Sequence, residues 1–347
     1  MSVEFVIKKK IQGFSLDISM KSSARRIGIL GASGCGKSMT LKSIAGIVNP
    51  DEGNIVINGK TFFDSKRKIN ERTQKRNVGY MFQNYALFPN MTVEKNIFCG
   101  LACGKEEKMQ KAEKMIRKFR LEGLEKRYPH ELSGGEQQRV ALARIMAYEP
   151  NIILLDEPFS AMDMFLKDQL FKELMQFLED YEGTVLLVSH NRDEIYQFSE
   201  EILVLDHGKS ICQGNTKEIF KNPGKKEAAK LTGCKNISRI HKISDYQILV
   251  KDWNLKIHTK EKVNDDISYI GIRAHEFIPV WEMPKQNAIP IRQYEITELP
   301  FEHKFFIRTD GEKEIYWYVQ KEKMKIIKEK GMPKYLEIPE EEILLLE

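Results

Sequence analysis

The sequence lacks an uninterrupted run of about 18 apolar residues, the minimum for a membrane-spanning helix. Its amino end also lacks the order of a signal peptide, because Lys8, Lys9 and Lys10 follow the only apolar cluster there instead of preceding it. The composition is otherwise that of a soluble globular protein, with 41% hydrophobic and 30% charged residues in 347. We therefore expect the chain to stay in the cytosol and to form about two domains.

Cysteine and net charge are also low. The 55 basic and 50 acidic residues leave a net charge of only +5, which indicates solvated mixed-charge faces, and we expect no nucleic-acid partner. The cysteines are odd in number and scattered, which favours reduced thiols over a disulfide framework or a metal site. They are Cys35, Cys99, Cys103, Cys212 and Cys234.

A glycine-rich phosphate loop, G-x-x-x-x-G-K-S, stands between a predicted strand at residues 26–30 and a predicted helix at residues 39–47. In such a loop, backbone N–H groups wrap the phosphates of a nucleotide, the lysine reaches the β- and γ-phosphates, and the serine hydroxyl binds Mg²⁺. The strand-loop-helix context therefore predicts a site for ATP and Mg²⁺. The predicted ATP-binding residues are Gly31, Ala32, Ser33, Gly34, Cys35, Gly36, Lys37, Ser38 and Met39.

Residues 132–163 carry three further features. Gly134 and Gly135 stand at a predicted helix start, where bare backbone N–H groups and the helix dipole favour an anion. Residues 152–155 predict a buried parallel strand that ends in Asp156 and Glu157. Open α/β sheets bind their ligands at the carboxyl ends of strands, so both carboxylates are expected at such a ligand edge.

This run, LSGGEQQRVALARIMAYEPNIILLDEPFSAMD, resembles the signature motif, Walker B strand and D-loop of ATP-binding cassette (ABC) ATPases, with Met162 where the family usually has leucine. The resemblance implies an α/β P-loop NTPase cassette with a RecA-like core, an antiparallel β subdomain and a helical subdomain. The β subdomain is expected from short strands at residues 3–7 and 14–18 and from a hairpin at Asn58 and Gly59.

The resemblance also assigns chemical roles. Gln83, in FQNYALFP, resembles the family's Q-loop glutamine, and His190, in VSHNRDE, resembles its H-loop histidine. In the family Glu157 would polarise the attacking water, while His190 would contact the γ-phosphate. The implied Mg²⁺ ligands are Ser38, Gln83 and Asp156, and the implied catalytic residues are Lys37, Gln83, Glu157 and His190.

The same resemblance implies partners. Two cassettes would pair head to tail as a homodimer, each covering the nucleotide of the other, because the helical subdomain separates the signature from the phosphate loop. That subdomain is expected at about residues 85–145, and the segment from Tyr85 to Pro89 would lie in the groove that receives a transmembrane permease. The residues implied to contact the partner's ATP are Ser133, Gly134, Gly135, Glu136 and Asp163.

A helix is also expected at residues 105–120 of the helical subdomain. Apolar side chains recur there at helical spacing, which predicts a buried stripe. They are Met109, Ala112, Met115, Ile116 and Phe119.

The composition changes near residues 222–235, which places the expected domain boundary after residue 232. Beyond it, short β-like runs predict a small barrel at residues 233–347. The run IRAHE, residues 272–276, resembles the accessory OB- or TOBE-like domain of importer ATPases. The predicted strands are residues 247–250, 255–258, 268–272, 289–292, 304–308 and 315–319.

A cassette followed by such a domain resembles the ATPase subunit of an importer, peripheral on the cytoplasmic face of the membrane, with an external substrate-binding protein as an indirect partner. The motifs most resemble molybdate, tungstate or sulfate importers, although residues 284–290 lack the serine that oxyanion-sensing versions have. Iron(III), polyamine or sugar import remains an alternative. A soluble ATPase acting on ribosomes or DNA is an alternative of another class, but the chain has neither a second cassette nor an inserted coiled coil.

Two hypotheses concern single side chains. The family stacks an aromatic ring on adenine, and Phe14 or Phe5 is a candidate, with core packing as the alternative. Cys35 lies in the phosphate loop near a helix start, where a thiol pKa is expected to fall. Oxidation of Cys35 would then block nucleotide binding, the alternative being a small residue with no redox role.

Overall fold

The computed structural model describes residues 2–160, 164–284 and 286–347. The chain folds as two compact units, residues 1–217 and 218–347. The sequence places the boundary later, after residue 232, but helix α9 (Lys226–Leu231) belongs to the second unit because Ala229 packs with Cys234 and Leu346. In the described part of the chain, no helix has the length and apolar character needed to span a membrane.

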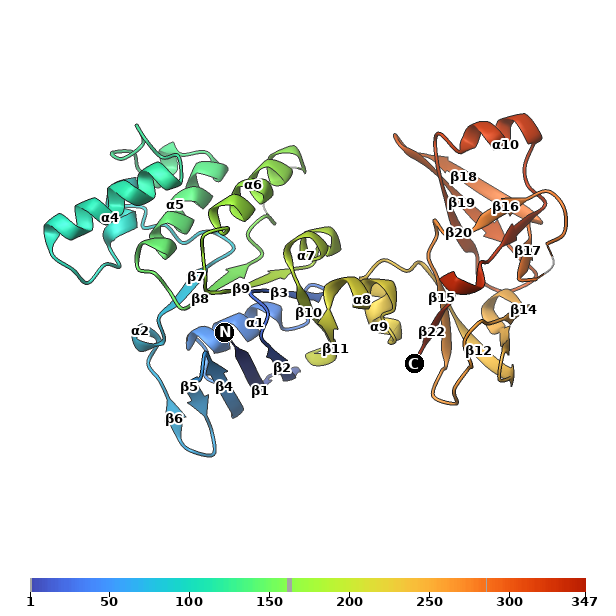
Figure 1. Ribbon diagram of the computed structural model, residues 1–347, viewed down its shortest axis with the longest axis horizontal. Helices are drawn as coiled ribbons and strands as arrows, with labels where there is room; N and C mark the ends of the chain where they lie inside the picture. The colour runs from blue at the N-terminus through green and yellow to red at the C-terminus, as the bar shows by residue number, and fades with distance from the viewer. Residues whose placement is uncertain (1, 161–163, 285) are drawn as a thin grey trace. The chain divides into compact units, whose positions relative to one another are not determined.

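The described residues of the first unit form an eleven-stranded sheet in the order β6-β5-β4-β1-β2-β11-β10-β3-β9-β8-β7 (Figure 1). The five strands from β10 to β7 are parallel, and every residue of β8 and β9 is buried, which explains their continuous apolar runs. The carboxyl ends of these strands therefore meet at one edge. Their bounds are β3 (Arg26–Gly31), β7 (Val78–Met81), β8 (Ile152–Asp156), β9 (Thr184–Ser189) and β10 (Glu201–Asp206).

The other strands form a region that is antiparallel except for the short parallel pairing of β11 with β2. The predicted hairpins are confirmed at Gly13, between β1 and β2, and at Asn58 and Gly59, between β4 and β5, where all three residues have positive φ. Strand β1 is longer than predicted because its lysine-rich half still pairs with β2. The bounds are β1 (Val3–Ile11), β2 (Phe14–Ser22), β4 (Glu52–Ile57), β5 (Lys60–Asp64), β6 (Ile69–Asn70) and β11 (Lys209–Asn215).

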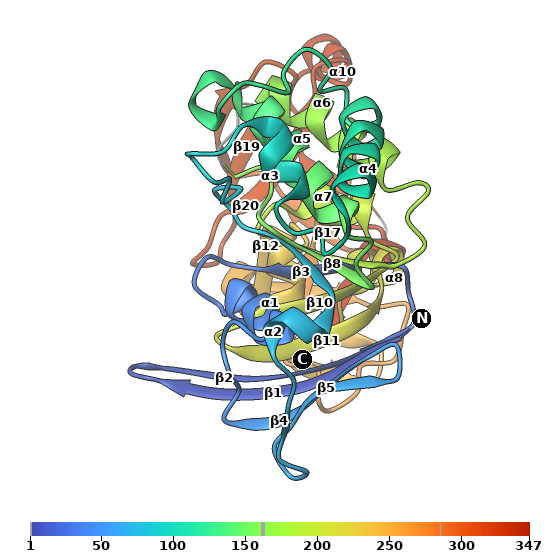
Figure 2. The ribbon, with the colours of Figure 1, turned by 90° about the vertical axis from the view of Figure 1, so that its left-hand side faces the viewer.

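A helical region packs beside β7, on the other side of the parallel strands from the antiparallel region (Figures 1 and 2). It consists of α3 (Val93–Phe98), α4 (Lys105–Lys118), the 3₁₀ turn η1 (Pro129–Glu131) and α5 (Gly134–Ala147). The predicted stripe of α4 is buried except at Met109, which is 52% exposed because it lies nearer the free amino end of the helix. The other helices of this unit are α1 (Lys37–Ala45), α2 (Thr73–Arg76), α6 (Met164–Phe177) and α7 (Arg192–Phe198), and α8 (Thr216–Lys221) follows.

The second unit is mainly β structure around a core that includes Trp253, Phe305 and Trp317. The six predicted strands are confirmed, whereas β12, β16, β18, β21 and β22 were not predicted; β18 has Tyr294 and Ile296 alternating with polar residues, but all of its residues are exposed. Its described strands form sheets in the orders β14-β13-β12-β15-β22, β16-β21-β17 and β18-β19-β20.

The bounds in this unit follow the chain order. They are β12 (Asn236–Ser244), β13 (Gln247–Val250), η2 (Lys251–Trp253), β14 (Leu255–His258), β15 (Tyr269–Ile272), β16 (Ile278–Val280), β17 (Ala288–Pro290), β18 (Gln293–Glu298), β19 (Glu302–Arg308), β20 (Ile315–Gln320), α10 (Met324–Lys330), β21 (Tyr335–Glu337), η3 (Glu340–Glu342) and β22 (Leu344–Leu346).

Candidate functional site

The phosphate loop connects β3 to α1 at the carboxyl edge of the parallel strands. Gly34 and Gly36 have φ angles of +79° and +107°, which other residues rarely adopt. A Cβ atom on Gly31 would lie 2.6 Å from the backbone oxygen of Leu205, so only glycine fits there. Ala32, Ser33 and Gly34 are exposed, and the turn is therefore open to a ligand on its outer side.

Lys37 is the buried cation of this loop. Its side chain is only 4% exposed, and its Nζ donates hydrogen bonds to the carbonyl oxygens of Gly31, at 3.0 Å, and Ala32, at 2.9 Å. The same Nζ lies 3.4 Å from Oε1 of Glu157. A positive charge is thus held at the centre of a loop that is shaped for phosphate.

Asp156 stands at the end of β8 between two hydroxyl donors. Ser38 Oγ donates to Oδ1 and the Tyr80 phenol donates to Oδ2, each at 2.7 Å. Burial and the negative charge of Asp156 raise the pKa of Tyr80, so the phenol stays protonated as a donor. Tyr80 was not predicted as a site residue; the signal that could have found it is a hydroxyl side chain in β7, the strand that pairs directly with β8.

Glu157 and His190 come together from the ends of β8 and β9. Glu157 has a φ of +47°, and its N–H donates to the carbonyl oxygen of Val188 at 3.1 Å. Its Oε2 lies 3.2 Å from His190 Nδ1. The carboxylate is therefore held between the Lys37 ammonium on one oxygen and the His190 imidazole on the other.

Gln83 follows β7, and its Nε2 donates to Ser160 Oγ at 3.0 Å. This hydrogen bond leaves the amide oxygen of Gln83 available as a ligand. Magnesium prefers oxygen ligands, and Ser38, Asp156 and Gln83 supply hydroxyl, carboxylate and amide oxygens. With the Ser38 and Asp156 oxygens already 2.7 Å apart, this donor set fits Mg²⁺.

The signature residues Ser133 to Glu136 begin helix α5. The Glu136 carboxylate accepts from Ser133 N–H at 2.7 Å and from Ser133 Oγ at 2.8 Å, and these bonds lower its pKa below the usual value. In the described residues, no hydrogen bond or ion pair joins this helix start to the phosphate loop of the same chain. Asp163 lies outside the described residues.

The adenine candidates differ in burial. Phe5 is fully buried in the core, so stacking of Phe5 on adenine is wrong. Phe14 is partly buried and packs against that core close to Gly36. Phe14 therefore stays a candidate.

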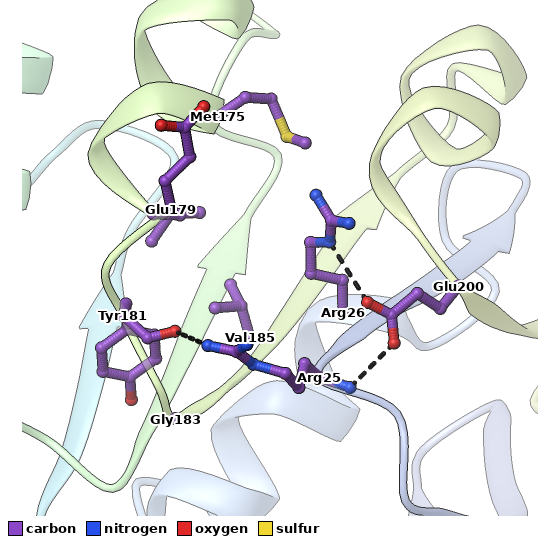
Figure 3. Close-up of a pocket in the computed structure, with 9 residues that line it drawn as sticks. Arg25, Arg26, Met175, Glu179, Tyr181, Gly183, Val185 and Glu200 are labelled. Carbon is purple, nitrogen blue, oxygen red and sulfur yellow. Dashed lines mark hydrogen bonds and ion pairs between the residues drawn. The ribbon is translucent and has the colours of Figure 1, made fainter.

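A separate cavity of about 240 Å³ lies at the opposite edge of the sheet, where β3 and β9 begin (Figure 3). Arg25 donates through its guanidinium to Tyr181 O at 2.7 Å and through its N–H to Glu200, while Arg26 pairs with the same carboxylate at 3.4 Å. The bond to Tyr181 ties the start of β3 to the α6–β9 connection, and the contacts with Glu200 tie it to the α7–β10 connection. We therefore interpret these bonds as structural contacts that hold the fold together.

Comparison with known proteins decides the family. The family model described as "ABC transporter" matches residues 12–160. A sulfate/thiosulfate import ATP-binding protein of Thermosynechococcus vestitus is 31% identical over 326 residues, covering 93% of this chain and 90% of that protein. This chain belongs to the ABC transporter ATP-binding family. The ABC assignment made from the signature and phosphate loop is therefore confirmed.

Two further relatives and a solved structure match shorter parts of this ABC ATPase. An Fe(3+) ions import ATP-binding protein of Haemophilus influenzae is 39% identical over 208 residues, and the match covers 59% of this chain and 59% of that protein. A match with the sulfate/thiosulfate import protein of a Synechocystis strain spans 58% of that protein. The dimeric post-hydrolysis structure of an ATP-binding cassette bound to ADP and Pi aligns with a TM-score of 0.51 at 27% identity, covering 62% of this chain and 98% of that one. These matches confirm the cassette fold.

Cys35 in this ABC cassette contradicts the expectation of a lowered thiol pKa. The side chain is 4% exposed, and burial raises its pKa in spite of Lys37 nearby. A protonated thiol reacts slowly with peroxide. We therefore expect brief treatment with hydrogen peroxide to leave ATP affinity unchanged, as measured by titration with a fluorescent ATP analogue. A loss of affinity that Cys35→Ala prevents would restore the redox hypothesis.

Proposed function

We propose that this chain is the ATP-hydrolysing subunit of an import complex, acting as a homodimer beneath a membrane permease. The observation that carries the proposal is the cluster of Lys37, Glu157 and His190, which joins the phosphate loop to the ends of two parallel strands. Around a terminal phosphate, such a cluster would supply a cation, a carboxylate and an imidazole. Positioning and electrostatic stabilisation are what phosphoryl transfer requires.

Each residue then has a role. Lys37 and the loop amides neutralise the phosphates, and Glu157 polarises the attacking water while His190 holds it in place. Ser38, Asp156 and Gln83 would hold Mg²⁺, which supplies further neutralisation of the β- and γ-phosphates when bound. Tyr80 keeps the Asp156 carboxylate oriented through its second oxygen.

A second copy would complete the site. In the described residues, no hydrogen bond or ion pair joins Ser133 to Glu136 to the phosphate loop of their own chain, and they present a capped helix start with an open face at Gly134. We assign them, together with Asp163, to the ATP held by the partner copy. The similar cassette of known structure is itself a dimer bound to ADP and Pi, which supports this assembly.

The segment from Tyr85 to Pro89 is the proposed contact with the permease. Arg144, near the end of α5, donates to the carbonyl oxygens of Tyr85 at 2.9 Å and Ala86 at 2.8 Å. Tyr85 and Ala86 have positive φ, and the Tyr85 phenol donates to the carbonyl oxygen of Pro158, the residue directly after the Walker B pair Asp156 and Glu157. Phe88 stays 47% exposed beside the Arg144 guanidinium, so an apolar side chain is offered to a partner on the cytoplasmic face of the membrane.

For the cargo we propose a sulfate-type oxyanion, with molybdate or tungstate as members of the same chemical class. The support is the sulfate/thiosulfate import relative that aligns along 93% of this chain. Iron(III) is the second candidate because of the 39% identical Fe(3+) import relative. Both relatives are import proteins, which favours transport over a soluble ATPase acting on ribosomes or DNA.

The test is uptake by cells that lack their own sulfate-import ATPase subunit and carry this chain with its cognate permease. We expect uptake of radiolabelled sulfate to return with the native chain and not with Lys37→Ala. Radiolabelled molybdate and iron(III) are measured in parallel. Uptake of iron(III) alone would replace the oxyanion assignment, and ATP hydrolysis without uptake of any of the three would overturn the importer role.

A further inference from the structure

An ion pair joins helix α6 to helix α7 near His190, between a buried carboxylate and a partly buried ammonium group. Glu194 is 7% exposed, and its Oε1 pairs with Nζ of Lys167. Its other oxygen, Oε2, accepts a hydrogen bond from Ser189 Oγ at 2.5 Å. Glu194 ends the run VSHNRDE that carries His190, and Lys167 lies outside the predicted motifs; the chemistry proposed above gives neither side chain a role.

Ser189 is the last residue of β9 and directly precedes His190. Its hydroxyl oxygen also accepts the N–H of Asn191 at 2.9 Å, so the hydroxyl spans the turn that carries His190. The Asn191 side chain then caps α7 by accepting the N–H groups of Asp193 and Glu194. The direction of the His190 imidazole toward Glu157 is thus set by hydrogen bonds on both sides of it.

The orientation of Glu194 depends in turn on Lys167. A buried carboxylate without its partner is costly, and it turns toward any other donor or toward water. The other basic residue in this turn, Arg192, pairs with Asp193 and not with Glu194. Lys167 lies in the first turn of α6, which begins at Met164, immediately after the proposed D-loop.

We infer that Lys167 is a positioning residue, which acts through Glu194 and Ser189 to aim His190 at Glu157. The inference rests on the proposed ATP hydrolysis at this site. It makes the geometry of His190 depend on the position of α6, the helix that follows the D-loop. An α6 that moves when the partner copy docks would align or misalign His190 without touching the nucleotide.

The test compares steady-state ATP hydrolysis of two variants of the full chain. Lys167→Met removes the cation, and Ser189→Ala removes the connecting hydroxyl while it leaves the ion pair intact. We expect kcat to fall about tenfold in each, with the KM for ATP unchanged, because a small displacement of a positioned group costs rate and not binding. Lys167→Arg restores kcat, and Lys172→Met, an exposed lysine of the same helix, has no effect.

The deciding experiment measures the residual kcat when each of the two substitutions is made in a His190→Ala background. Because they act through His190, neither substitution lowers the residual kcat further, whereas a merely structural role would add its loss. Thermal melting of Ser189→Ala separates misfolding from misalignment. Native kcat in both variants, or additive losses with His190→Ala, overturns the inference. A native chain with no ATP hydrolysis would instead overturn the proposed function.

Discussion

Glu157→Gln keeps ATP binding and lowers ATP hydrolysis by about two to four orders of magnitude, the usual contribution of a positioned general base. The amide has the shape of the carboxylate, so its contacts with Lys37 and His190 remain sterically possible. It lacks the negative charge that polarises a water molecule. ATP then stays intact between two cassettes, and the closed homodimer accumulates.

Phosphate release and sedimentation velocity with ATP and Mg²⁺ measure the two effects of Glu157→Gln. Glu182→Gln is the matched control, because Glu182 is exposed at the opposite end of β9. Normal turnover in Glu157→Gln would remove Glu157 from the mechanism. A variant that is inactive but monomeric with ATP would contradict the composite site made with Ser133 of the partner copy.

Lys37→Ala weakens ATP binding by about a hundredfold, on the basis of two charge-assisted hydrogen bonds to phosphate at about 1.5 kcal/mol each. The buried ammonium is held ready by Gly31 and Ala32, so its removal deletes the only positive charge placed inside the loop in the described residues. Hydrolysis falls at least in proportion. A fluorescent ATP analogue measures the affinity directly.

Lys42→Ala is the control for Lys37→Ala, because Lys42 lies in the last turn of the same helix α1. We expect native affinity in this control. Thermal melting of Lys37→Ala without nucleotide checks that the loop still folds. Unchanged affinity in a folded Lys37→Ala chain would show that the nucleotide phosphates lie elsewhere.

The central site was predictable because its residues sit in local motifs at strand ends. The buried runs before Gly31, Asp156 and His190 identify parallel strands, and parallel strands present their carboxyl ends at one edge. That edge is where Lys37, Glu157 and His190 meet. The motifs and their spacing along the chain therefore predicted most of the candidate site.

The contacts around this core were not predictable from spacing. Tyr80 reaches Asp156 only because β7 lies next to β8, and strand order is not written in either strand. Cys35 shows a competition between two effects: the helix start and Lys37 lower its pKa, but burial outweighs them. Burial depends on the whole core and could not be read from the loop.

In the second unit, too, only part of the β structure could be predicted from the sequence. Strands with alternating burial, such as β19 and β20, were found from the sequence. Strand β18 was not predicted, although Tyr294 and Ile296 alternate with polar residues in its sequence. All of its side chains are exposed, and its pairing with β19 depends on the fold of the whole unit.

Helix α5 carries Ser133 at its start and Arg144 about 16 Å farther along its axis, at 1.5 Å per residue. The first end serves the partner's nucleotide in the proposed dimer, and at the second end Arg144 donates to the carbonyl oxygens of Tyr85 and Ala86, in the segment proposed to contact the permease. A hydrogen-bonded helix resists compression, so it behaves as a stiff rod between these ends. A movement of the permease would therefore displace the opposite cassette. Because each copy has one such helix, the two cassettes would move at the same time.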